Sequence, residues 1–319
     1  MLRLNKSALA NHLRFYLVAI LSAIIFCSCS SEKKEPSDTP TSGEVNIDVD
    51  ESFQQLFDTE IYTFQSLYSN AKVYVTYLPE GEAIQRLLND SCKVAVVCRD
   101  LTSDELMRFK QANIYPVSTK IAEDAVAFIV NKENMDTAMT FEKMKSILVG
   151  NDSLWKQVNN QSQLGNINIV FDNNGSANTR YIKDTVLKGA AFSRNAFAVK
   201  SNPEVIEYVR NHKNAMGVLS VNWISDKDDP LTLSFLKEIK VVGFIKETSP
   251  LVVKPYQEYI KTNDYPFTRD VYMINRQTRA GLGMGFVSFV AGEKGQKIIL
   301  KSGIVPAIIP ERLIQINTK

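Results

Sequence analysis

Histidine and cysteine are scarce in this chain of 319 residues, which has two histidines and four cysteines. His12 and two of the cysteines lie within the first 29 residues, so His212, Cys92 and Cys98 remain for the rest of the chain. These are too few for a Cys/His zinc site, and no nucleophile motif stands beside His212. We therefore expect no metal, no cofactor and no enzyme activity. Cys92 and Cys98 lie on one expected strand, roughly 20 Å apart, so we expect them to be buried and unbonded.

An excess of charge of one sign is also absent. The formal net charge is +2, and removing residues 1–28 takes away three of the 37 basic residues and none of the 35 acidic ones, so the remainder carries about −1. A chain with this balance and no basic run is a poor candidate for binding nucleic acid. No glycine-rich phosphate loop occurs either: the run Gly281 to Gly285 lacks the spacing of a dinucleotide loop, and it favours close helix packing.

Long apolar runs are missing too. Phe15–Phe26 has 12 residues, too few to cross a bilayer, and with the basic residues before it this run predicts a cleaved export signal over residues 1–28. Cys29 follows the small residue Ser28 and precedes a polar stretch, which resembles the lipobox of bacterial lipoproteins. Ordinary secretion with a chance cysteine is the alternative. We expect a lipid on Cys29 that holds the protein at a membrane surface, followed by a flexible tether over residues 29–43.

What the chain does contain is a repeated alternation of strand and helix patterns. Strands are predicted at Val45–Val49, Lys72–Tyr77 and Lys93–Cys98, each followed by a helical pattern. Two of the helix starts have the spacing of capping boxes, Ser52 with Gln55 and Thr102 with Glu105. Three such units in succession favour a parallel sheet covered by helices on both faces, and the pattern resumes after a strand at Ala125–Val130.

The stretch Phe171–Arg180 combines a strand end, a tight turn and a helix start in ten residues. Ser176 is placed as the N-cap, and the first backbone N–H groups of a helix have no partner within it, which suits a bound oxyanion. A plain capped helix is the alternative. Similar starts occur at Ser52–Phe53 and Gly81–Ala83, and three of them around one cleft would bind a small anion rather than act on it chemically.

Three further motifs occur in a specific order: Asp124–Asn131, Tyr265–Tyr272 and Gly295–Pro306. In this order the chain resembles, over about residues 44–307, the phosphate-binding proteins of bacterial ABC transporters, a periplasmic-binding-protein class. The resemblance implies an α/β, two-lobed type II fold in which each lobe is a mainly parallel sheet covered by helices. It further implies a first lobe of residues 44–122 plus 271–319, a second lobe of residues 123–270, and a hinge at about residues 121–125 and 266–272.

The resemblance also implies a set of ligand-binding residues in four loops, namely Ser52, Phe53, Gly81, Glu82, Arg99, Ser176, Ala177 and Asn178. The second loop lacks the family's usual hydroxyl. Asp172 stands where the family has an arginine, and a carboxylate facing the ligand there would repel an anion. Arg99 is the candidate for the missing cation. The alternative for Arg99 is a surface ion pair with Asp100 or Asp104.

The expected function is that of a substrate-binding lipoprotein of an ABC importer that binds phosphate or a similar small oxyanion between its lobes. The expected partners are the anion and an ABC permease in the inner membrane, with no nucleic acid. We expect an exported, membrane-anchored monomer on the periplasmic side. The alternative function is that of an accessory or sensor protein that has this fold and no longer takes part in transport.

Overall fold

A computed structural model of the chain describes residues 38–246, 249–277 and 279–310. The expected signal segment 1–28, the lipidation candidate Cys29 and the first part of the expected tether lie outside these residues. Within the described ranges, every helix is too short or too polar to cross a bilayer.

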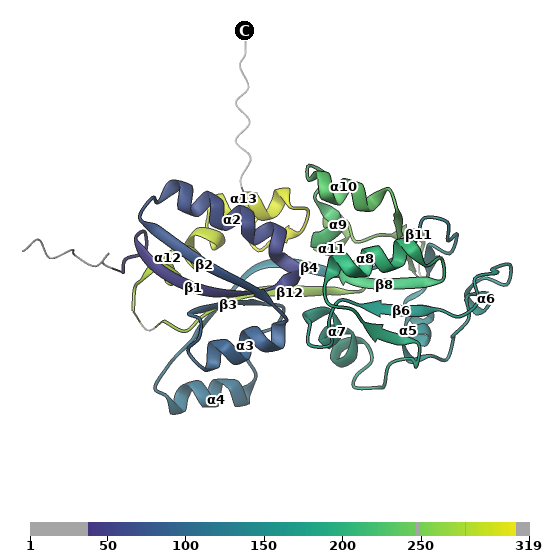
Figure 1. Cartoon of the computed structure of the whole chain (residues 1–319), viewed down its shortest axis with the longest axis horizontal. Coiled ribbons are helices and arrows are strands. Elements are labelled where there is room, and N and C mark those ends of the chain that lie inside the picture. Colours follow the sequence, from purple (N-terminus) through teal and green to yellow (C-terminus); the bar gives the residue numbers. More distant parts are fainter. Residues whose placement is uncertain (1–37, 247–248, 278, 311–319) are drawn as a thin grey trace, which may run out of the picture. The chain divides into compact units, whose positions relative to one another are not determined.

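The first lobe is a mixed sheet in the order β2-β1-β3-β12-β4. Its first three strands, β1 (Gly43–Asp50), β2 (Ala71–Leu78) and β3 (Val94–Val97), are parallel, which confirms the prediction from the alternating strand and helix patterns. β12 (Thr268–Asn275) lies between β3 and β4 (Val117–Asn131) in the same sheet and is antiparallel to both of them. Figure 1 shows α2 and α3 on opposite faces of this sheet. The helices of these units are α2 (Gln54–Leu67), α3 (Glu80–Leu88) and α4 (Ser103–Gln111).

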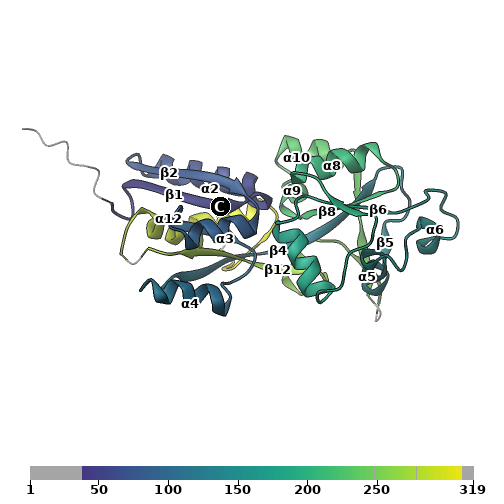
Figure 2. The same ribbon diagram turned by 60° about the horizontal axis from the view of Figure 1, so that its bottom comes forward.

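β4 belongs to both lobes. Its first part pairs with β12 as far as Ala125, and from Val126 to Val130 it pairs with β8 (Ala215–Ser220) of the second lobe. β8 is in turn parallel to β6 (Asn168–Phe171), which is parallel to β7 (Ala196–Ala198). Figure 2 shows β4 and β12 between the two lobes. The two-lobed α/β fold is therefore confirmed.

The remaining elements complete the two lobes. They are the 3-10 turn η1 (Glu51–Phe53), β5 (Ala138–Met139), α5 (Phe141–Val149), α6 (Trp155–Val158), α7 (Ala177–Tyr181), the π-helical turn η2 (Ile182–Val186), α8 (Asn202–Asn211), α9 (Asn222–Ser225), α10 (Pro230–Leu236), β9 (Ile239–Val241), β10 (Gly243–Lys246), β11 (Ser249–Val253), α11 (Gln257–Lys261), α12 (Leu282–Ala291), α13 (Glu293–Lys301) and β13 (Val305–Pro306). Trp155 begins α6, where its buried indole N–H donates to the Asn214 carbonyl at 2.9 Å.

The core follows β4 through both lobes. Every side chain from Ala125 to Val130 is fully buried, because elements of both lobes cover the two faces of this strand. The ring of Phe128 packs edge-on against Phe244 and Phe267. Cys92 and Cys98 are buried and free, as predicted, although β3 begins after Cys92 and ends before Cys98.

The residues just before β1 are packed on α12, although they fall within the expected tether. The Asp38 carboxylate accepts the Leu282 N–H at 2.7 Å, and the backbone of Pro40 lies so close to Gly285 that a Cβ atom there would overlap the Pro40 carbonyl. The glycine-rich run therefore serves close packing, as predicted, and the neighbour it admits is a loop rather than another helix.

Candidate functional site

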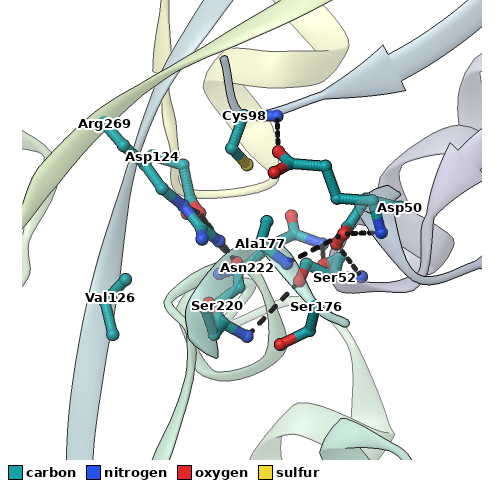
Figure 3. A network of polar contacts seen from close by, with 12 residues as sticks. Asp50, Ser52, Cys98, Asp124, Val126, Ser176, Ala177, Ser220, Asn222 and Arg269 are labelled. Atoms are coloured by element: carbon teal, nitrogen blue, oxygen red, sulfur yellow. Dashed lines mark hydrogen bonds and ion pairs between the residues drawn. The ribbon is translucent and has the colours of Figure 1, made fainter. Parts of the chain in front are cut away.

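Three strand-to-helix turns that sequence patterns single out meet at one carboxylate. Asp50 is the last residue of β1 and is fully buried. Its Oδ1 accepts the Ser52 N–H at 2.9 Å, and its Oδ2 accepts the N–H groups of Glu80 at 3.1 Å and Ala177 at 3.4 Å. Glu80 begins α3 and Ala177 begins α7, so backbone donors from both lobes converge on Asp50 (Figure 3).

Ser52 and Phe53 are fully buried at the first of these turns. The expected capping box of Ser52 with Gln55 is wrong, because Asp50 is the residue whose side chain caps the turn. The Ser52 hydroxyl lies 3.5 Å from Asn178 Nδ2, and its carbonyl accepts the Asn222 side-chain N–H at 3.1 Å. Ser52 thus contacts two amide side chains of the second lobe.

The other expected capping box, formed by Thr102 and Glu105 at the start of α4, is present as predicted.

At the second turn, Gly81 contacts the other lobe, whereas Glu82 points its side chain into solvent. The Gly81 N–H donates to the Gly175 carbonyl at 3.3 Å, which is a direct backbone bond between the lobes. The Glu82 side chain is exposed, whereas Glu80, two residues earlier, is buried. Glu80 accepts the Cys98 N–H at 2.7 Å. The acid that enters the site from this turn is therefore Glu80, because α3 starts earlier than the sequence pattern predicts.

Arg99, the candidate cation, is paired elsewhere. Its guanidinium makes two bonds of 2.8 Å to the carboxylate of Glu105 on α4, and its Nε lies 3.9 Å from Glu80. An ion pair was the alternative for this residue, but the acid is Glu105 rather than Asp100 or Asp104. The side chain is about a quarter exposed.

The third turn is organised around Asp172, which is fully buried. Its carboxylate accepts the Ser176 hydroxyl at 2.6 Å and the amide N–H groups of Asn178 at 2.8 Å and Asn202 at 3.2 Å. The Ser176 oxygen also accepts the Thr179 N–H at 3.1 Å, so Ser176 is the predicted N-cap. Asp172 is therefore a local acceptor that takes up the side-chain donors expected for a ligand.

Arg269 is one of the site residues that sequence reasoning missed. It lies opposite Asp124 in the β12–β4 ladder, and its Nε and Nη2 donate to the Asp124 carboxylate at 3.0 and 2.8 Å (Figure 3). Its side chain is 2% exposed, and Nη1 has no hydrogen-bond partner among the described residues. The available signal was a basic residue facing an acidic one across the two expected hinge strands.

Arg180, also missed, joins the lobes from α7. It forms an ion pair with Glu80 and donates to the Cys98 carbonyl at 3.3 Å. Together with the Gly81–Gly175 bond, this pair connects the start of α3 to the start of α7. The lobes are thus joined by contacts within the protein.

The site contains several buried carboxyl groups, and their charges act on one another. Burial is the largest cause that raises the pKa of Asp50 to about 6, and repulsion from Glu80 is the second. Burial is also the largest cause that raises the pKa of Glu51 to about 8, and repulsion from Asp172 is the second. Among the described residues, Arg269 Nη1 is a buried, charged donor without a partner, and the side-chain oxygens of Asn178 and Asn222 are buried acceptors without one. No group of three or more His, Cys, Asp or Glu side chains among the described residues could hold a metal ion.

Comparison with known proteins finds relatives that are named as phosphate-binding proteins. The Borreliella burgdorferi phosphate-binding protein PstS is 25% identical over 299 residues, which cover 91% of this chain and 96% of that protein. A putative phosphate ABC transporter substrate-binding protein with bound phosphate from Clostridium perfringens superposes with a TM-score of 0.68 at 20% identity, over 83% of this chain and all of that one. An ABC-type phosphate transport receptor from Vibrio cholerae gives a TM-score of 0.63 at 20% identity and the same coverage. These structural likenesses concern the fold.

A family model also matches most of the chain. It is described as a PBP superfamily domain and covers residues 34–294, which include all four expected ligand loops and both strands that connect the lobes. Because this match spans well over half of the sequence, the chain belongs to the PBP superfamily.

Proposed function

We propose that this chain is the substrate-binding component of an ABC importer and binds phosphate or a similar small oxyanion between its lobes. The observation that carries the proposal is Arg269 Nη1, a buried, charged donor without a partner among the described residues. Backbone N–H groups from both lobes, at Ser52, Glu80 and Ala177, converge nearby on Asp50. A fixed cation together with backbone donors is suited to a small anion.

The acceptors of the site favour an oxyanion that still carries a proton. Within the part of the chain that the structure describes, Asn178 and Asn222 each have a buried side-chain oxygen without a partner, and both side chains contact Ser52. A buried acceptor left unpaired costs about 1–3 kcal/mol, and a ligand O–H group would remove that cost. The relatives named above are phosphate-binding proteins, which agrees with this chemistry. The chain is accordingly a binding protein rather than an enzyme.

The remaining parts of the proposal concern the location and the moving parts. We propose an exported lipoprotein with its lipid on Cys29, anchored on the periplasmic side, that acts as a monomer and passes its ligand to an ABC permease. Residues 44–122 with 271–319 would form one moving lobe and residues 123–270 the other. The long strand β4, which pairs within both sheets, would be part of the hinge.

Phosphate should stabilise the full-length chain against unfolding. At a concentration 100 times Kd, the expected gain is about 2.7 kcal/mol, because the ligand binds only the folded state. Calorimetric titration and thermal unfolding with phosphate, arsenate and sulfate measure this effect. An absence of heat and of any stability change with all three anions at millimolar concentration would contradict the proposal.

Replacing Ser52 and Asn178 together by alanine should weaken phosphate binding at least tenfold, because it removes two buried polar side chains that contact each other across the proposed site. The matched control is Thr140→Ala, which removes a hydroxyl that caps α5 outside the site and costs about 1 kcal/mol of stability. Unchanged phosphate affinity in the double variant would remove these two side chains from the proposed site.

An accessory or sensor role is the second candidate. Its supporting observation is that protein groups already use many of the donors: Asp50 takes three backbone N–H groups and Asp172 takes three side-chain donors. A chain that binds none of the tested anions but still associates with a membrane partner would favour this role.

A further inference from the structure

We infer that Asp50 is an internal anion that occupies the ligand's backbone donors in the unliganded protein, and that an oxyanion binds by displacing this carboxylate, which then takes up one proton. The inference rests on the proposed function. It adds a reason why the affinity of the site depends on pH, and it assigns that dependence to one residue.

The position of Asp50 supports the displacement. One of its oxygens accepts an N–H from Ser52, and the other accepts N–H groups of Glu80 and Ala177, which begin helices in different lobes. Backbone donors cannot turn away from the site as side chains can. A ligand that uses the same three donors must therefore take them from Asp50, and until then the Asp50 carboxylate joins the two lobes.

The surroundings of Asp50 explain the proton uptake. The charged or titratable groups that act on it are Glu51, Glu80, Asp172, Cys98 and Arg269. Glu80 is already paired with Arg180, and two nitrogens of Arg269 are committed to Asp124. A displaced Asp50 carboxylate would lie fully buried beside these acids and the bound anion, without its backbone donors. Burial of an unpaired carboxylate favours its neutral form.

The balance of the exchange is simple. Three N–H···O bonds pass from the Asp50 carboxylate to the anion, and one proton from solvent converts Asp50 to the carboxylic acid. The protonated Asp50 can then donate a hydrogen bond. No other bond forms or breaks, and the charge of the site changes by the ligand charge plus one.

The direction of the pH effect follows from this balance. Burial and Glu80 place the pKa of Asp50 at about 6 before the ligand binds. Below that pH the carboxyl is largely neutral already, and binding takes up little further proton. Above it, each binding event must take up one proton from solvent, so the affinity falls by up to about tenfold per pH unit until the pKa of Asp50 in the complex is reached.

The test measures protons taken up per bound phosphate. Calorimetric titrations of the full-length chain at pH 7.5, in two buffers with different ionisation enthalpies, give this number for the wild type and for Asp50→Asn. Asparagine has nearly the same shape but carries no charge and presents an N–H₂ group, so it cannot accept all three backbone bonds. We expect the variant to take up about one proton fewer and to bind phosphate at least tenfold more tightly at pH 8. Asp136→Asn, at a buried carboxyl outside the site that accepts a bond from Asn159, should leave both numbers unchanged.

The outcomes separate this inference from the proposed function. Equal proton uptake and equal affinity in the wild type and Asp50→Asn would overturn the inference and leave phosphate binding intact. If Asp50→Asn binds phosphate and the wild type does not, the result would support the inference that the Asp50 carboxylate competes with the ligand for the backbone donors. If neither protein binds phosphate between pH 5 and 8.5, both proposals fail. If Asp50→Asn does not fold, Asp50→Ser takes its place, with the same expected and contradicting results.

Discussion

Glu60→Leu should stabilise the protein by about 3 kcal/mol at pH 7. Glu60 is fully buried on α2, and neither of its side-chain oxygens has a hydrogen-bond partner among the described residues. Burial raises its pKa from 4.5 to about 9, so folding at pH 7 requires this carboxyl to take up a proton. That uptake costs about 1.4 kcal/mol of folding free energy for each pH unit by which the solution lies above the ordinary pKa of the carboxyl group, and leucine removes this cost.

The pH dependence gives this prediction its sign. The folded pKa of Glu60 is above the unfolded one, so the wild type has the full stability of this site below pH 4.5 and loses it as the pH rises toward about 9. The difference in the free energy of unfolding between Glu60→Leu and the wild type, measured with denaturant, should grow over this pH interval. Glu60→Gln should flatten the dependence too but gain less, because its buried amide still lacks partners. Glu142→Gln, at an exposed acid on α5, is the control. A stability difference that stays constant from pH 5 to 9 would contradict a buried neutral carboxyl.

Arg269→Leu should cost about 3–5 kcal/mol of stability and abolish anion binding. Among the described residues, the substitution leaves the fully buried Asp124 carboxylate with only the Ser220 hydroxyl as a side-chain donor, and an unpaired buried charge is strongly destabilising. It also removes Nη1, the free donor of the proposed site. Chemical unfolding and phosphate calorimetry measure the two effects.

A double variant separates the two roles of Arg269. Arg269→Leu with Asp124→Leu replaces the ion pair by apolar side chains, which should recover most of the stability while binding stays lost. Arg276→Gln is the matched control: Arg276 is another buried arginine, which pairs with Asp90 and donates to carbonyls at the end of α3, outside the site. It should lose stability and keep phosphate affinity. Wild-type affinity in the double variant would contradict Arg269 as the ligand's cation.

Local patterns singled out three helix starts, and the backbone donors that converge on Asp50 come from these three turns, whereas the fourth loop, around Arg99, was named from the family resemblance alone. Ser176 caps α7 as its sequence predicts, because a cap depends on residues three positions apart. The start of α3 was misplaced by a few residues, which is why Glu82 was named and Glu80 was not. Helix ends are weakly determined by local sequence, since Pro79 and Glu80 are compatible with either a turn or a first helical turn.

The alternation of strands and helices, the α/β class and the three helix starts of the site follow from local sequence. They depend on periodicity and on contacts within a few residues, which are visible along the chain. The partners of those helix starts follow from the folded chain instead. Asp50 and Ala177 are 127 residues apart, and Arg269 and Asp124 are 145 apart. Such pairs depend on strand register and on the packing of two lobes. For that reason the stretch around Ser176 was predictable as a helix start, whereas its neighbours Asp50 and Arg269 were not.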